Sequence, residues 1–317
     1  METEKKIPLL VWIILDVLLI MAAIVLGIFF YHNSSKGPEE LEVVEENPRL
    51  VIPIEERYQS HSQMVRTWYR ITDGILYGTG KNAYGQLGIG QLDDLRVNYT
   101  EPIQIAGNVV HVDSCQATVV YLTEDHKLWG MGDNFSGQLG VPIGEDERTG
   151  KKRYVTTPVL IAEKVRYAAV GIHNVIILKE DGSVYVLGGN ETGQLGPTLD
   201  EREYLRDESE MIVSYSYEPV LIMENAVYVE SGLYTLAAIN DKGELYMWGD
   251  NSFGEIGNGN RGEGLPTIST YYVSEPYLVK KNMKDVRFDE FTVYATNFWD
   301  EIFAWGSGYD TIPKKIK

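Results

Sequence analysis

The sequence predicts an all-β fold: a β-propeller of about five four-stranded blades, preceded by one N-terminal transmembrane helix. Two observations predict it, a glycine-rich phrase that recurs from residue 80 onward and a long apolar stretch near the N-terminus. Complete copies of the phrase begin at Gly80, Gly132, Gly188 and Gly249, and a truncated copy lies at Gly306. The copies are 52, 56, 61 and 57 residues apart. Periods of this size are typical of propellers, solenoids and arrays.

Each repeat unit contains short β-rich runs separated by Pro, Gly and Asp-Gly signals. A unit aligns on a proline, followed by an apolar strand, an alternating strand, a turn and a Tyr/Trp-Gly strand. The aligned prolines are Pro48, Pro102, Pro158, Pro219 and Pro276. Such runs indicate antiparallel hairpins, and four strands in each unit match one propeller blade. Five units either close a small ring or leave an open ring that a partner completes.

The transmembrane helix is predicted over residues 7–31, a 25-residue apolar stretch whose single charge is Asp16. As a helix it would be roughly 37 Å long, enough to cross the hydrocarbon core of a membrane. A cleaved signal peptide is the alternative, but its apolar region is usually shorter and is followed by a small-residue cleavage site. We therefore expect an uncleaved anchor. Asp16 is interpreted either as a polar contact between helices or as a tolerated lone carboxylate.

The flanking charges predict the orientation of this helix. Lys5 and Lys6 precede it, and an acidic run over residues 39–46 follows it. The positive-inside rule then predicts a single-pass protein of the cell membrane with its C-terminal domain outside. The acidic segment between helix and repeats, which contains Gly37-Pro38, is typical of an extended linker. The predicted parts are a cytoplasmic tail (1–6), the transmembrane helix (7–31), the linker (32–47) and the repeat domain (48–317).

The repeated phrase is interpreted as structural. Its glycines permit positive φ and close backbone approach, and its apolar residues are expected to be buried between blades. The residues assigned to this role, together with two tryptophans of the Trp-Gly strands, are Gly85, Gln86, Leu87, Gly88, Gly137, Gln138, Leu139, Gly140, Gly193, Gln194, Leu195, Gly196, Gly254, Ile256, Gly257, Trp248 and Trp305.

The phrase, together with Trp129-Gly130, Trp248-Gly249 and Trp305-Gly306, resembles the signature of the regulator of chromosome condensation repeat family, Trp-Gly-x-Asn-x-x-Gly-Gln-Leu-Gly. The resemblance covers residues 48–317 and implies a β-propeller. Members of that family usually have seven blades, whereas this chain has five units and the last lacks the Gly-Gln-Leu-Gly phrase. With its apolar N-terminal stretch, the chain looks like a bacterial-type, membrane-anchored member.

Variable loops separate each phrase from the next proline, and equivalent loops of a repeat protein emerge on one face. Tyr and Arg, which are enriched at binding hot spots, recur in these loops. The predicted binding residues are Tyr99, Tyr154, Tyr204, Tyr215, Tyr217, Tyr271, Tyr272 and Arg261. The alternative interpretation is a set of solvated loops with incidental tyrosines. We therefore expect a non-catalytic module or scaffold that binds a protein or a cell-surface ligand.

Charge and motif content argue against other classes of function. The net charge of −18 disfavours nucleic acid, whose binding relies on Lys and Arg. The sequence has no catalytic or phosphate-binding motif, and its single cysteine, Cys115, allows no Cys-based zinc site. No enzyme activity, cofactor or metal is expected. Two alternatives stay open: the resemblance implies a guanine-nucleotide-exchange regulator, and a similar propeller in a β-lactamase inhibitory protein implies an inhibitor of an extracellular enzyme.

Overall fold

The computed structural model describes residues 66–143, 153–197, 204–206, 212–262 and 271–317. The chain divides into two compact units, Met1–Asn47 and Pro48–Lys317, and every described residue belongs to the second. The expected tail, transmembrane helix, linker and first proline therefore lie outside the described residues. Among the residues that are described, no helix is long and apolar enough to span a membrane.

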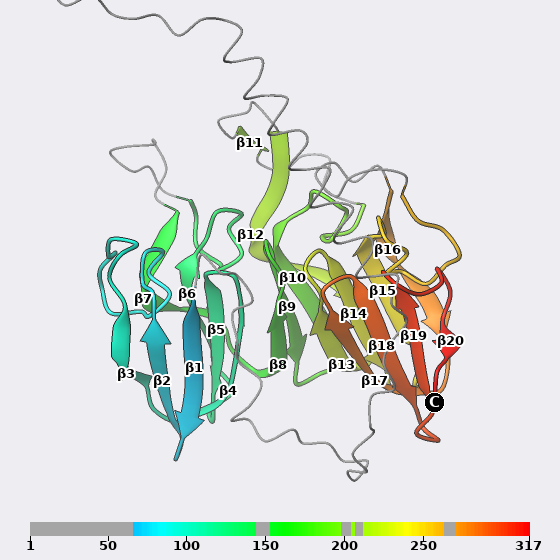
Figure 1. Ribbon diagram of the computed structural model, residues 1–317, viewed down its shortest axis with the longest axis horizontal. Helices are drawn as coiled ribbons and strands as arrows, with labels where there is room; N and C mark the ends of the chain where they lie inside the picture. The colour runs from blue at the N-terminus through cyan, green and yellow to red at the C-terminus, as the bar shows by residue number, and fades with distance from the viewer. Residues whose placement is uncertain (1–65, 144–152, 198–203, 207–211, 263–270) are drawn as a thin grey trace, which may run out of the picture. The chain divides into compact units, whose positions relative to one another are not determined.

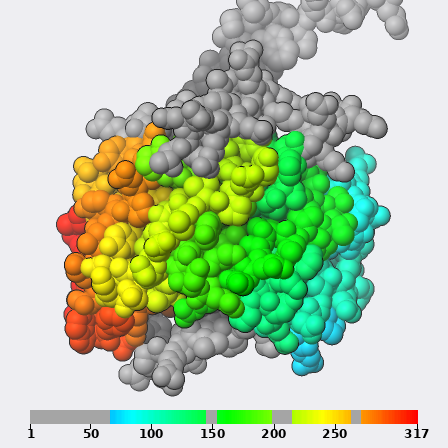
Figure 2. Space-filling model, turned by 180° about the vertical axis from the view of Figure 1, so that it is seen from behind, coloured from blue at the N-terminus to red at the C-terminus, as the bar shows by residue number. Residues whose placement is uncertain are grey.

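All regular structure in the described residues is β-strand, as the predicted fold class requires. The strands form five antiparallel sheets that follow one another in chain order (Figure 1), and Figure 2 shows the same order from behind. The first two sheets contain β1 (Thr67–Thr72), β2 (Ile75–Gly80) and β3 (Tyr99–Ala106), then β4 (Val109–Cys115), β5 (Thr118–Thr123), β6 (Leu128–Asp133) and β7 (Tyr154–Ala162).

The third sheet contains β8 (Val165–Val170), β9 (Asn174–Lys179), β10 (Val184–Gly189) and β12 (Ile212–Met223), with β11 (Tyr204–Arg206) on the outer edge of β12. The fourth and fifth sheets contain β13 (Ala226–Ser231), β14 (Thr235–Asn240), β15 (Leu245–Asp250) and β16 (Tyr272–Lys280), then β17 (Met283–Asp289), β18 (Thr292–Asn297), β19 (Ile302–Gly306) and β20 (Lys314–Lys315).

The proline-containing strand closes a sheet rather than opening one. β7, which contains Pro158, pairs with β6, and β3, which contains Pro102, pairs with β2. The sequence unit and the sheet are therefore offset by one strand. The cause is that consecutive strands of a chain usually pair with one another. The strand that follows each variable loop therefore pairs with the strand that precedes the loop.

Each Gly-Gln-Leu-Gly loop lies in the seam between its own sheet and the next. Within the loop, Asn134 Oδ1 accepts a hydrogen bond from the Leu139 amide (2.8 Å), and Gln138 Oε1 accepts one from the Ser136 amide (2.9 Å). Across the third seam, the Trp248 indole N–H donates to the Gln194 carbonyl oxygen at 2.9 Å. The apolar residues that fill the four seams are fully buried: Leu87, Leu139, Leu195 and Ile256.

Among the described residues, strand β1 of the first sheet and strand β18 of the last sheet are fully buried on one face only. The middle strands β5, β9 and β14 are buried on both faces, whereas β1 and β18 alternate between buried and more exposed residues. Trp68 on β1 is 42% exposed, although its register equivalent on β5, Val119, is fully buried. Among the described residues, the end faces of β1 and β18 are therefore not covered by one another.

Candidate functional site

The strands run between two ends of the propeller that differ in their loops. The repeated phrases, the variable loops and the turns such as β4–β5 lie at one end, here called the loop end. The short turns such as β5–β6 and β14–β15 lie at the other, here called the turn end. In Figure 1 the loop end is at the top of the sheets and the turn end is at the bottom.

Side chains from three consecutive sheets meet at the loop end. The ring centroid of His173, on the β8–β9 turn, lies 5.9 Å from that of Phe135 and 5.9 Å from that of Tyr234. His173 Nδ1 lies 2.9 Å from Glu191 Oε1, and the Arg153 guanidinium carbon lies 4.7 Å from the centre of the Phe135 ring. We call these five residues the aromatic–ionic cluster.

Arg153 is held in place by Asp133, at the end of β6. Its Nε and Nη2 donate to the two carboxylate oxygens at 3.1 and 2.6 Å. Burial opposes the charged form, but the hydrogen bonds and charge of Asp133 raise the pKa of Arg153 overall. The paired guanidinium also lies 5.2 Å from the centre of the Tyr154 ring. A planar cation fixed in this way is preorganised, because little rotamer freedom is left to lose on binding.

The remaining polar groups of the cluster offer both an acceptor and a donor. Glu191 Oε2 is buried and has no hydrogen-bond partner. Burial, with a contribution from the nearby Glu191 carboxylate, raises the pKa of Tyr234 to about 12, so its phenol stays protonated and able to donate. Aromatic faces beside a carboxylate and an imidazole suit the recognition of polar and cationic side chains. In the part of the chain that the structure describes, no group of three or more His, Cys, Asp or Glu side chains could hold a metal ion.

The tyrosines predicted from the sequence do not converge on one spot. Tyr154 contacts the aromatic–ionic cluster through Arg153. The Tyr99 hydroxyl donates to Asp93 Oδ2 at 3.1 Å. Tyr272 is 51% exposed and Arg261 is also exposed. Tyr217 and Tyr271 are half-buried, and the Tyr204 side chain lies outside the described residues.

Tyr215 differs from the prediction, because it is only 6% exposed. A Cβ added at Gly137 would lie 3.2 Å from the Tyr215 ring and 3.0 Å from Tyr217 Cβ. Both tyrosines therefore pack over the repeated phrase of the preceding sheet. The outer strand β12 of the third sheet thus covers the repeated-phrase loop of the second sheet. The composition of the loops alone does not reveal this contact.

The aromatic–ionic cluster is not apparent from the sequence as a site. Strand pairing within a sheet brings Phe135 to Arg153 and His173 to Glu191. The stacking of the sheets then joins these pairs to each other and to Tyr234. One signal is present in the sequence: Phe135 and Glu191 follow the asparagine of the repeated phrase, at a position where the copies differ. Variable positions inside an otherwise constant phrase are candidates for function, since packing does not fix them.

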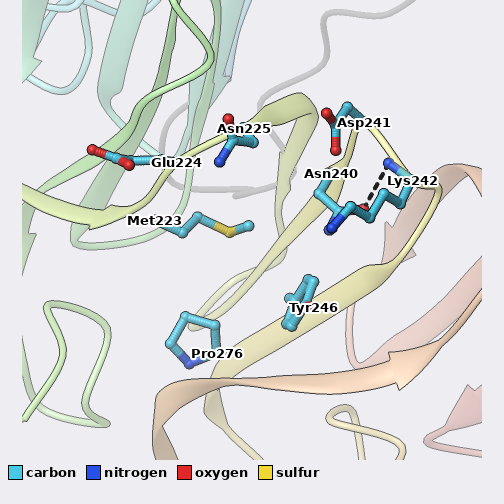
Figure 3. Close-up of a pocket in the computed structure, with 8 residues that line it drawn as sticks. All are labelled: Met223, Glu224, Asn225, Asn240, Asp241, Lys242, Tyr246 and Pro276. Carbon is cyan, nitrogen blue, oxygen red and sulfur yellow. Dashed lines mark hydrogen bonds between the residues drawn. The ribbon is translucent and has the colours of Figure 1, made fainter.

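Hollows lie at equivalent places of the turn end. One, of about 480 Å³, lies between the β12–β13 and β14–β15 turns and is lined by Met223, Lys242, Tyr246 and Pro276 (Figure 3). Another, of about 420 Å³, lies at the equivalent β3–β4 and β5–β6 turns. In Figure 3 the Lys242 amide donates to Asn240 Oδ1 at 3.0 Å. Because the same turns form both hollows, they are a consequence of blade geometry and do not mark a specific site.

Comparisons with known proteins agree with this architecture. Residues 73–120 match the family model "Regulator of chromosome condensation (RCC1) repeat". The human X-linked retinitis pigmentosa GTPase regulator is 34% identical over 153 residues, which cover 47% of this chain and 13% of that protein. The bovine secretion-regulating guanine nucleotide exchange factor is 30% identical over 195 residues, covering 59% and 39%. The mouse serine/threonine-protein kinase Nek9 is 29% identical over 247 residues, covering 75% and 24%. The chain therefore spans less than half the length of each of these relatives.

Solved structures show the same fold. Human WBSCR16 matches with a TM-score of 0.61 at 17% identity, over 79% of this chain and 65% of that chain. Prp20p from Saccharomyces cerevisiae matches with a TM-score of 0.59 at 20% identity, over 79% and 61%. The named relatives are eukaryotic, so they do not support the expected bacterial type. Residues 73–120 therefore carry a regulator of chromosome condensation repeat, and the described part of the chain folds as a β-propeller.

Proposed function

We propose that this protein is a non-catalytic, membrane-anchored propeller that binds a protein partner through its loop end, outside the cell. The aromatic–ionic cluster is the observation that carries this proposal. It places two aromatic rings, an imidazole, a guanidinium and a partly unpaired carboxylate on turns held by three sheets. Aromatic residues and Arg on rigid elements are the usual anchors of protein interfaces.

The charge of the chain supports a partner with a basic surface. The net charge is −18, and Glu191 Oε2 lacks a hydrogen-bond partner. Complementary charge steers association and selects among partners. Among similar proteins, two are named as a GTPase regulator and an exchange factor, and Prp20p is described as having binding properties to Gsp1p and histones. These properties belong to those proteins, and they support a binding role here.

We expect the double variant Phe135→Ala/Arg153→Ala to weaken partner binding at least tenfold, because hot-spot anchors typically contribute about 2 kcal/mol or more each. The measurement is crosslinking capture with the full chain in detergent or in membranes, followed by quantification of the captured protein. The matched control is Asp125→Ala/Lys127→Ala, an exposed ion pair at the turn end (2.7 Å). Equal capture by both double variants would contradict the proposal.

Guanine-nucleotide exchange is the second candidate, favoured by the similarity to the bovine exchange factor. It requires a propeller in the cytoplasm, whereas the positive-inside rule predicts one outside. Protease treatment of intact cells separates the two functions. If protease added outside the cells cleaves the propeller, the exchange hypothesis is excluded. If the propeller is fully protected from the protease, the extracytoplasmic hypothesis is excluded.

A further inference from the structure

The last sheet differs from the others at its β18–β19 turn, and the neighbouring sheet provides an internal control. In the β14–β15 turn, Asn240 Oδ1 accepts hydrogen bonds from the amides of Lys242 (3.0 Å) and Glu244 (2.9 Å). In the β18–β19 turn, Asn297 Oδ1 accepts them from the amides of Trp299 (3.0 Å) and Glu301 (2.9 Å). The two turns therefore have the same backbone scaffold.

The side chains at the two tips are nevertheless different in kind. Asp241-Lys242 occupies the first turn, and Phe298-Trp299 takes its place in the second. Phe298 is 55% exposed and Trp299 is 67% exposed. Because Asn297 holds the turn through its side chain, the Trp299 ring is not needed to form it. At the same two positions the second and third sheets carry Glu124-Asp125 and Glu180-Asp181, and the shorter turn of the first sheet is Asp73-Gly74.

Lysines surround this aromatic tip. The Phe298 amide donates to the Asn282 carbonyl oxygen at 3.0 Å, and the Ile316 amide donates to the Ile302 carbonyl oxygen at 2.8 Å, so three chain segments meet here. Ile316 is 47% exposed. We call this region the turn-end corner, and it comprises Phe298, Trp299, Ile316, Lys280, Lys281, Lys284, Lys315 and Lys317.

The C-terminal segment that forms the last sheet also differs in charge from the rest of the chain. Residues 280–317 hold seven basic and six acidic side chains, whereas the whole chain holds 28 and 46. Lys281 and Lys315 pair with Glu244 and Glu301 at 2.8 and 2.6 Å, and both lysines stay more than half exposed. Exposed pairs of this kind are weak, so these lysines remain available to other anions.

We propose that the turn-end corner contacts an anionic lipid bilayer, with the Trp299 ring at the level of the headgroups. Tryptophan is enriched at membrane interfaces because its ring is apolar and its N–H is polar. Lysines close to the bilayer are attracted to anionic headgroups. A stable protein interface buries roughly 800 Å² on each partner, whereas this tip offers two aromatic rings and one isoleucine. That is enough for shallow insertion, so the observations favour lipid over a protein partner.

This inference rests on the proposed anchor, which would bring the propeller to a bilayer. Because the turn end and the loop end are opposite ends of the same strands, contact at the turn-end corner directs the loop end away from the membrane. The aromatic–ionic cluster is then presented to a partner in solution or on a facing surface.

The test uses the full chain with Trp299→Cys, labelled with a polarity-sensitive dye and mixed with phosphatidylcholine vesicles with or without phosphatidylglycerol. Both labelled variants also carry Cys115→Ala, because the native thiol is only partly buried. We expect a blue shift and a several-fold rise in dye emission on the anionic vesicles, reversed by high salt. The matched control is Arg261→Cys, an exposed position at the loop end, which is expected to stay unchanged.

Each outcome decides the inference. A dye at position 299 that stays in a polar environment on anionic vesicles, or that matches position 261, overturns it. A shift that needs added protein instead of lipid also overturns it and indicates a protein partner. The further variant Lys281→Gln/Lys315→Gln/Lys317→Gln, which removes exposed lysines, is expected to reduce the shift at least threefold without lowering the melting temperature. Flotation after an alkaline wash reports on the anchor separately, so failure of the anchor and failure of the lipid contact are distinguishable.

Discussion

Replacing Glu255 by glutamine is expected to stabilise the propeller by about 2–3 kcal/mol at neutral pH. Glu255 stands in the fourth repeated phrase, where the first three have Gln86, Gln138 and Gln194. It is 1% exposed, and its Oε1 has no hydrogen-bond partner. Burial raises the pKa of this carboxyl to about 8, with a smaller contribution from the charge of Asp250. Folding therefore keeps a proton on Glu255 at a pH where the unfolded chain has lost it.

The pH dependence has a defined sign. Below the ordinary pKa of about 4.5, Glu255 is protonated in both the folded and the unfolded chain, so its titration does not change the free energy of unfolding. Between about 4.5 and 8 the unfolded chain ionises and the folded one does not, so stability falls as the pH rises through this window. The variant lacks this loss, and its advantage over the unsubstituted chain should grow between pH 5 and pH 8. Thermal unfolding followed by circular dichroism at both pH values measures it.

Its control is the reciprocal change Gln138→Glu in the second phrase. The Gln138 amide donates to Thr118 Oγ1 at 3.0 Å and to the Asp133 carbonyl oxygen at 3.1 Å, and a carboxylate loses both bonds. We expect that variant to be less stable, and increasingly so at higher pH. A melting-temperature gain for Glu255→Gln that is the same at pH 5 and pH 8 would show that titration of Glu255 is not the cause.

Truncating Trp248 to alanine is expected to cost about 3–5 kcal/mol of unfolding free energy. Its indole ring is fully buried between the third and fourth sheets, in a cluster with Leu195 and Leu236. Its N–H donates to the Gln194 carbonyl oxygen, which would be left without this donor. Urea unfolding of the full chain measures the loss.

The conservative variant Trp248→Phe separates packing from hydrogen bonding. It keeps an aromatic ring in the seam and removes only the indole N–H donor, so we expect a clearly smaller loss than for alanine. Similar losses for the two variants would indicate that the hydrogen bond dominates. A loss below about 1 kcal/mol for alanine would mean that this seam does not hold the sheets together.

Much of the fold can be predicted because a blade is specified locally. The spacing of the phrase, the alternation of the strands and the position of the turns all lie within one repeat unit. The pattern predicts Leu139 and Ile256 in the seams between blades, and the structure buries both completely. The candidate site is predicted less well. The tyrosines that loop composition indicates include Tyr215, which packs against a neighbouring phrase instead of facing solvent.

The repeat pattern alone specifies the all-β class, the five units and the residues that fill each seam, because repeated residues at a near-constant spacing satisfy the same local contacts each time. Only the folded structure shows which strand closes each sheet and which faces of the end sheets are less buried. It also shows that Phe135, His173 and Tyr234 meet across three sheets. These features need the fold because contacts across a seam depend on how whole sheets stack. Stacking joins side chains that are distant in the chain, and no local pattern records which of them will face each other.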